Sequence, residues 1–169
     1  APIYHREAKE PAYLVDVRAF RLDGIDDLTD PQPALEQLLA WPSIASKNWV
    51  YRQYDHMVRN NTIVNPGSDA AVVRVKGDSI PGGDDRNGDF PEKILAISVD
   101  CNAVQVYLDP FEGAKGAVAE CARNLAYSGA TPIGTTDNLN FGNPHNPELF
   151  WQLKESVRGL AEGCEAFNA

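Results

Sequence analysis

Apolar residues recur at three- and four-residue steps in three segments, and each segment opens with a residue that suits a helix start. Asp30, Asp109 and Asn146 each precede a proline, so each can cap a helix whose first position is proline. We therefore predict helices from residue 31 to Pro42, from residue 110 to Gly129, and from residue 147 onwards. The first carries the apolar stripe Leu35, Leu38 and Leu39, and the other two are expected to bury Ala117, Val118, Cys121, Ala122 and Leu125, and Phe150, Leu153, Val157, Leu160, Cys164 and Phe167.

Short apolar runs bounded by turn-forming residues predict five strands, at residues 12–15, 62–64, 70–75, 94–99 and 132–136. The run at 94–99 is almost continuously apolar, which is typical of a central strand buried on both faces. Residues 77–91 are rich in Gly, Asp and Pro, so we expect an exposed loop there. The strand–helix–strand–helix order predicts a further strand after the last helix, and without it a sheet edge would be exposed. The pattern indicates an α/β (α+β) fold.

Length, composition and net charge limit the class of protein to which the chain can belong. With 169 residues, 43% of them hydrophobic and 23% charged, it fits one soluble globular domain. A net charge of −9 argues against nonspecific binding of nucleic acid, because a polyanion would be repelled. A chain this acidic needs metal ions or backbone N–H groups to bind phosphates.

The cysteines and the first residues bear on cellular location. Cys101, Cys121 and Cys164 match neither a disulfide framework nor a zinc site, so we expect reduced thiols in the cytoplasm. No apolar run approaches the length of a membrane span, and no signal peptide is visible. Because the chain begins at Ala1 rather than Met, we expect a segment of a longer protein or a processed chain.

Carboxylates and amides stand near the ends of several predicted elements. Glu120 and Asn124 are four residues apart, so they project from one face of a helix, and Asp69 lies at the entrance to a strand. Oxygen ligands of this kind suit Mg²⁺, which usually binds together with a substrate phosphate. The alternative is that Asp69 is an ordinary turn residue and that Glu120 and Asn124 are solvated side chains on a helix.

A second candidate cluster follows the strand expected at 132–136. Asp137, Asn138, Asn140 and Asn143 surround two apolar residues, and ligands in α/β folds gather beyond strand carboxyl ends. An Asx-rich turn is the alternative. Three further side chains have mainly structural interpretations: Cys101 as a small buried thiol, His56 as a hydrogen-bonded structural histidine, and Lys115 as a solvated lysine.

Long stretches of the chain resemble the large subunit of the phosphoribosylformylglycinamidine synthase family, in its short form. They are Ile44-Ala45-Ser46-Lys47, Val50-Tyr51-Arg52-Gln53-Tyr54-Asp55-His56-Met57-Val58-Arg59, Pro66-Gly67-Ser68-Asp69-Ala70-Ala71-Val72, Asp100-Cys101-Asn102, Val106-Tyr107-Leu108-Asp109-Pro110, Ala117-Val118-Ala119-Glu120-Cys121-Ala122-Arg123-Asn124, and Thr136-Asp137-Asn138-Leu139-Asn140-Phe141-Gly142-Asn143-Pro144 with Phe150-Trp151-Gln152-Leu153. The resemblance covers about residues 35–169 in order. It is therefore far more specific than any short motif.

The resemblance implies a fold and a reaction. It identifies residues 31–169 as the second aminoimidazole-ribonucleotide-synthetase-like N-terminal domain, lacking its closing strand, and residues 1–30 as a connector. In that family a mixed sheet with helices on one face pairs with a second sheet into a barrel-like dimer. The family joins formylglycinamide ribonucleotide, ATP and glutamine-derived ammonia. By motif match Asp137 is expected to contact ATP, and Asp69, Glu120 and Asn124 to bind magnesium at a second, pseudosymmetric nucleotide site.

The resemblance also implies partners: the first-half domain of the same subunit, a glutaminase subunit and a small bridging subunit. The isolated piece is expected to be inactive and to form a homodimer through its unpaired sheet face. Two alternatives stay open, a structural half-barrel without nucleotide contact and a related ATP-dependent phosphotransferase, such as a selenophosphate- or thiamine-phosphate-forming kinase. The string from Asp137 to Pro144 favours the synthase.

Overall fold

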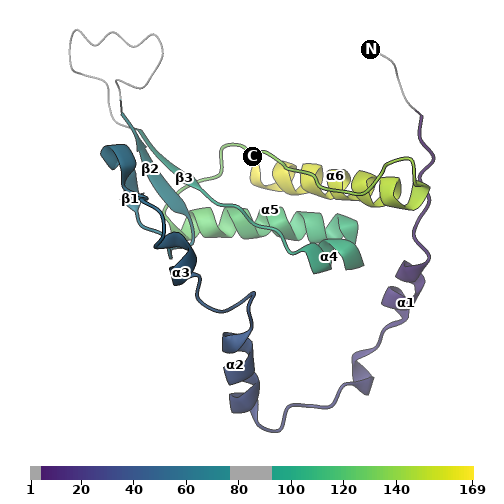
Figure 1. The fold of residues 1–169 in the computed structure, drawn as a ribbon. Coiled ribbons are helices and arrows are strands. Elements are labelled where there is room, and N and C mark those ends of the chain that lie inside the picture. The colour runs from purple at the N-terminus through teal and green to yellow at the C-terminus, as the bar shows by residue number, and fades with distance from the viewer. Residues whose placement is uncertain (1–4, 77–92) are drawn as a thin grey trace.

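Two long parallel helices and a small sheet make up the body of the molecule (Figure 1). The computed structural model describes residues 5–76 and 93–169. Helix α5 (Pro110–Tyr127) and helix α6 (Pro147–Phe167) run side by side, and the sheet lies at one end of the pair (Figure 1). The sheet contains β1 (Thr62–Val64), β2 (Ala71–Val75) and β3 (Lys93–Ile97), and α4 (Ala103–Leu108) packs against α5.

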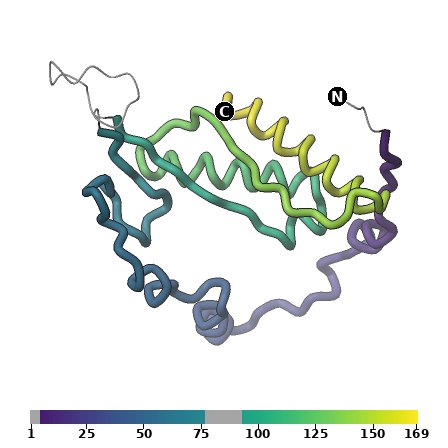
Figure 2. The backbone as a smooth tube through the Cα atoms, turned by 45° about the horizontal axis from the view of Figure 1, so that its top comes forward, coloured from purple at the N-terminus to yellow at the C-terminus, as the bar shows by residue number. Residues whose placement is uncertain are grey.

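The N-terminal part of the chain forms smaller elements. These are α1 (Tyr13–Ala19), the 3-10 turn η1 (Leu22–Gly24), α2 (Pro31–Ala40), α3 (Asn48–Tyr51) and the 3-10 turn η2 (Val58–Asn60). The backbone tube makes a wide arc from α1 through α2 and rejoins the body near the sheet (Figure 2). We call residues 20–44 of this arc the arm.

The three predicted helix starts are confirmed. The Asp30 carboxylate accepts from Gln32 N at 3.1 Å, and the Asp109 carboxylate accepts from Phe111 N and Glu112 N. The Asn146 side chain accepts from Glu148 N at 2.9 Å. Each capping side chain accepts hydrogen bonds from backbone N–H groups that have no partner inside the helix. The proline that follows lacks an N–H group, but in the first turn that group would have no helical partner anyway.

Helices α5 and α6 approach each other more closely than large side chains would allow. A Cβ atom placed on Gly159 would lie 2.2 Å from Phe111 O, and one on Gly163 would lie 3.0 Å from the Val118 Cβ. Beside these glycines, the buried face of α6 also includes Gln152, Glu155 and Ser156. Val118 and Ala122 of α5 are buried as predicted.

The predicted buried stripe of α6 is therefore wrong in part. Its half-buried residues are Phe150, Leu153, Leu160 and Cys164, and the two others are exposed. Val157 is 45% exposed and Phe167 is 42% exposed, because the helix turns its small residues rather than its large ones toward α5. Close backbone contact requires residues without bulky side chains, and this requirement outweighs the apolar period. The larger apolar residues of α6 consequently face away from α5.

The sheet is antiparallel in the order β1-β2-β3, where the sequence predicted a mixed sheet. In the register of β2 with β3, Val73 lies opposite Leu95 and Ala71 opposite Ile97. The prediction that residues 94–99 form a central strand buried on both faces is wrong. In the described part of the chain β3 is an edge strand, and Ile94 and Ile97 are 64% and 53% exposed. A continuous apolar run does not reveal whether its covering layers are present.

Two other predicted strands are absent at their positions. Residues 12–15 begin α1 instead, because a four-residue apolar run suits either element and only Leu14 is buried, at 3% exposure. Residues 132–136 have no strand assignment, since an extended segment becomes a strand only with a hydrogen-bonded neighbour. Strands at 62–64 and 71–75 are confirmed. The loop predicted at 77–91 lies outside the described residues.

None of the helices in residues 5–76 and 93–169 combines the length and apolar content that crossing a lipid bilayer requires.

The close contact of α5 with α6 predicts the effect of a single methyl group. Gly159→Ala should destabilise the fold by about 1–3 kcal/mol, because the added Cβ meets backbone that cannot move aside. The free energy of unfolding, from urea titration followed by circular dichroism, measures the change.

Gly116→Ala provides the matched control. Gly116 is also inside a helix, but its added Cβ would find nothing nearer than the Gln105 side chain at 3.9 Å. We expect it to be neutral or to stabilise by up to about 1 kcal/mol. Equal losses in the two variants would contradict the close-contact interpretation.

Candidate functional site

A hollow of about 200 Å³ lies between the 130–146 segment and the outward face of α6. Both views show this segment running back along α6 (Figures 1 and 2). Its lining is mostly apolar and consists of Thr135, Asp137, Val157, Leu160, Ala161 and Cys164. The hollow exists because α6 presents its apolar residues here rather than to α5. Asp137 is its one charged lining residue.

The asparagines around Asp137 hold the backbone in shape. Asn140 Nδ2 donates to Asn138 O at 2.9 Å, and His145 N donates to Asn143 Oδ1 at 3.0 Å. The Asx-turn interpretation is therefore confirmed for Asn143, whereas Asn140 makes a different side-chain-to-backbone hydrogen bond. Asp137 is different: it is exposed and has no hydrogen bond or ion pair within the described residues. Its carboxylate is free to meet a ligand.

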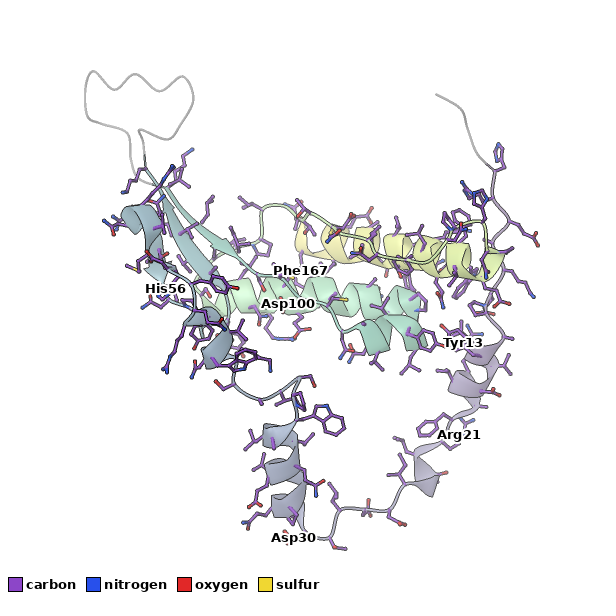
Figure 3. All side chains as sticks on the ribbon, in the orientation of Figure 1. Tyr13, Arg21, Asp30, His56, Asp100 and Phe167 are labelled. Carbon is purple, nitrogen blue, oxygen red and sulfur yellow. The ribbon has the colours of Figure 1, made fainter. Side chains whose placement is uncertain are left out.

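Asn124 joins a polar cluster at the end of the extended segment that follows β3. Its Nδ2 donates to both carboxylate oxygens of Asp100 at 3.1 Å, and Ser98 Oγ also donates to Asp100. Figure 3 labels Asp100 beside α5, the helix that carries Asn124. The sequence pointed to Asn124, and no local pattern could show that it meets Asp100.

Cys121 belongs to the same cluster. Partial burial raises the pKa of the Cys121 thiol, and the neighbouring Asp100 carboxylate raises it further. At neutral pH this thiol is therefore protonated and weakly nucleophilic. The three cysteines are free thiols.

The structure places the predicted metal ligands in two locations. Glu120 and Asn124 are half-buried and one turn apart on α5, and Asp69 is exposed in the turn before β2. In residues 5–76 and 93–169, no three His, Cys, Asp or Glu side chains form a group that could hold a metal ion. The metal site of Asp69, Glu120 and Asn124 stays a prediction.

The remaining sequence candidates have local roles. Lys115 forms ion pairs with Glu162 at 3.0 Å and Glu112 at 3.4 Å, and Glu162 raises its pKa most. Its ammonium group is thus engaged within the molecule. The backbone carbonyl of His56 accepts from Thr62 Oγ1, and its ring is exposed. Cys101 is exposed as well, so the prediction of a buried thiol is wrong. It lies beyond the end of β3, where no other described element covers it.

The hollow suits a small uncharged group better than a phosphate. Its apolar wall and one hydroxyl suit an uncharged group, and Asp137 can accept hydrogen bonds from that group. Its lining contains no lysine, arginine or histidine to neutralise phosphate charge.

The oxygen atoms of Glu120 and Asn124 are of the type that Mg²⁺ prefers. The chemistry of these two ligands therefore fits a magnesium ion, although they are only two.

Comparison with known proteins gives a consistent result. A family model described as "AIR synthase related protein, N-terminal domain" matches residues 67–169. The phosphoribosylformylglycinamidine synthase subunit PurL of Gloeobacter violaceus is 50% identical over 167 residues, which are 97% of this chain and 22% of that protein. The PurL subunit of Alkaliphilus metalliredigens is 48% identical over 168 residues, 99% of this chain and 21% of that protein. The chain thus spans about a fifth of the length of the curated relatives it matches.

The polar cluster of Ser98, Asp100, Cys121 and Asn124 predicts that the reactivity of the Cys121 thiol depends on Asp100. At pH 8, Asp100→Asn should raise the alkylation rate of Cys121 several-fold, because removing the neighbouring negative charge lowers the thiol pKa. Peptide mass spectrometry after timed treatment with iodoacetamide gives the rates.

Cys164, on α6, is the internal control and should react at the same rate in both proteins. An unchanged rate at Cys121 would show that Asp100 does not influence that thiol.

Proposed function

The chain belongs to the family of AIR synthase related proteins, through the N-terminal domain of that family, and we propose that it is an internal segment of a phosphoribosylformylglycinamidine synthase subunit PurL. The observation that carries the proposal is the continuity of the match: about half of the residues are identical to PurL along 97–99% of this chain. Such a match extends through elements and connections alike, so it supports a shared role rather than a shared fold alone.

The proposed reaction is the ATP-dependent ligation of purine biosynthesis that the family resemblance implies. Formylglycinamide ribonucleotide, ATP and ammonia give formylglycinamidine ribonucleotide, ADP and inorganic phosphate. ATP transfers a phosphoryl group to the amide oxygen, and ammonia then displaces that oxygen as phosphate. Catalysis of this type consists mainly of positioning and charge neutralisation. A domain with a few well-placed oxygen ligands can therefore contribute to it without supplying a nucleophile.

Asp137 is the residue through which we propose that this segment meets ATP. Three features support the role: its exposure, its lack of a partner within the described residues, and its place in the lining of the hollow. The apolar wall of α6 would face the nucleoside, and the carboxylate would accept hydrogen bonds from it. Phosphate neutralisation has to come from groups outside the hollow, because its lining has no cationic side chain.

Asp69, Glu120 and Asn124 are proposed to bind magnesium at a second nucleotide site. The metal would screen phosphate charge on a chain whose net charge is −9. Asn124 keeps its Oδ1 free for this purpose, since it is Nδ2 that donates to Asp100. The proposed partners are the other half of the same subunit, the glutaminase subunit that supplies ammonia and the small bridging subunit.

A structural half-barrel without nucleotide contact is the second candidate. The exposed apolar residues of β3 favour it, because an edge strand with Ile94 and Ile97 uncovered is suited to packing against another domain. The two roles can coexist, and replacement of Asp137 separates them.

Asp137→Ala in the subunit that carries this segment should lower kcat/KM for ATP about tenfold to a hundredfold. This is the effect expected from losing one charged hydrogen-bond acceptor, worth about 1.5–3 kcal/mol. Steady-state kinetics measures the loss, and circular dichroism checks that the fold is intact.

Asp16→Ala is the control, since Asp16 is exposed on α1 and lies in none of the proposed sites. If Asp137→Ala retained full activity, the packing role would be favoured over nucleotide contact.

The segment by itself should show no ligase turnover, because the hollow lacks the cationic groups that phosphoryl transfer requires. Phosphate release from ATP in the presence of formylglycinamide ribonucleotide and ammonia measures it, with the longer subunit as the positive control. Robust turnover by residues 1–169 alone would refute the proposed division of the site.

A further inference from the structure

The chain is attached to the body just before the arm and again beyond it. The apolar residues of the arm itself make neither attachment. Before it, the Tyr13 ring stacks on Tyr107 with centroids 4.5 Å apart, and the Tyr13 hydroxyl accepts from Gln152 Nε2 at 2.9 Å. Leu14 is buried and Lys9 N donates to Pro147 O at 3.1 Å. These contacts attach the chain to α4 and α6 just before the arm leaves the body.

The second anchor lies beyond the arm, where the chain enters the sheet. Arg74 N donates to Asn61 O at 2.7 Å, and Lys76 Nζ donates to Arg59 O at 2.7 Å. Figure 3 shows Tyr13 beside the body, whereas Arg21 and Asp30 lie out along the arc. The arm is therefore a fixed span between two attachment points rather than a free tail.

Apolar surface on the arm is uncovered along its whole length. All nine large apolar side chains between residues 20 and 44 are at least 48% exposed, including Phe20 at 60%, Leu28 at 72% and Trp41 at 59%. On α2, Leu35, Leu38 and Leu39 share one face and are all exposed. A ten-residue helix is marginal in water without tertiary packing, so α2 needs a surface that covers this face.

The charge of the arm limits what that surface can be. It carries five acidic side chains and one basic one, on a chain of net charge −9. A second copy of the chain, or an anionic membrane, would place like charges together. An apolar surface with a basic rim fits best.

We propose that the arm docks on another part of the same polypeptide, with the apolar face of α2 as its centre. This inference rests on the proposed function, under which the chain is a segment of a longer subunit. The curated relatives align with 97–99% of this chain, arm included, and four-fifths of their length lies outside the match. The covering surface is thus available in the same molecule, at high effective concentration.

Hydrogen exchange of the full-length subunit tests the proposal. Amides of residues 31–40 should exchange on the order of 100-fold more slowly than in an unstructured peptide, because docking suppresses local opening. Leu35→Asp combined with Leu39→Asp should abolish that protection. Leu35→Asp alone should weaken that protection strongly, whereas Gln37→Asp, which adds the same single charge to the opposite face of α2, should keep it.

A second measurement guards against misfolding of the double variant. Carbodiimide coupling of the wild-type subunit should link Asp26 or Asp27 to lysines outside this segment but within the same chain, as mixed isotope labelling would show. Three results would overturn the proposal: free-peptide exchange of residues 31–40, protection that persists in the double variant, or cross-links and protection that appear only with dimerisation in light scattering. Neither readout involves nucleotide or turnover, so loss of the proposed ATP role would leave this test intact.

Discussion

The close contact between α5 and α6 determines how the rest of the molecule is arranged. Gly159 and Gly163 let the two helix backbones meet where any Cβ would collide with Phe111 or Val118. Once this small-residue face is turned toward α5, the larger residues of α6 must point elsewhere. They form the wall of the hollow that includes Asp137. The site thus follows from a packing requirement several residues away from it.

Electrostatics explains why this site cannot be complete by itself. A hollow whose only charged lining residue is an aspartate, in a chain of net charge −9, repels a triphosphate. Two cations on the long helices are already engaged within the molecule: Lys115 pairs with Glu162 and Glu112, and Arg158 pairs with Glu155. The proposed nucleotide contact at Asp137 would therefore need metal ions or basic groups from outside the hollow.

Local signals predicted the features that depend on neighbouring residues in the sequence. The caps at Asp30, Asp109 and Asn146 were predictable because a cap is satisfied within four residues. Features that depend on distant residues were not. The hydrogen bonds of Asn124 to Asp100 join residues 24 apart, and the buried face of α6 was set by glycines that an apolar period ignores. The placement of Asp137 in the lining of a hollow likewise required the structure.

Two errors in the sequence-based prediction share one cause, which also bears on function. The continuous apolar run at β3 and the apolar stripe of α6 were assigned to a core, and both are partly exposed. The arm adds a third uncovered apolar surface. A sequence that is patterned for burial at three places, all of which its described elements leave at least partly exposed, is patterned for further contacts. Under the proposed function, those contacts are with the rest of a longer subunit.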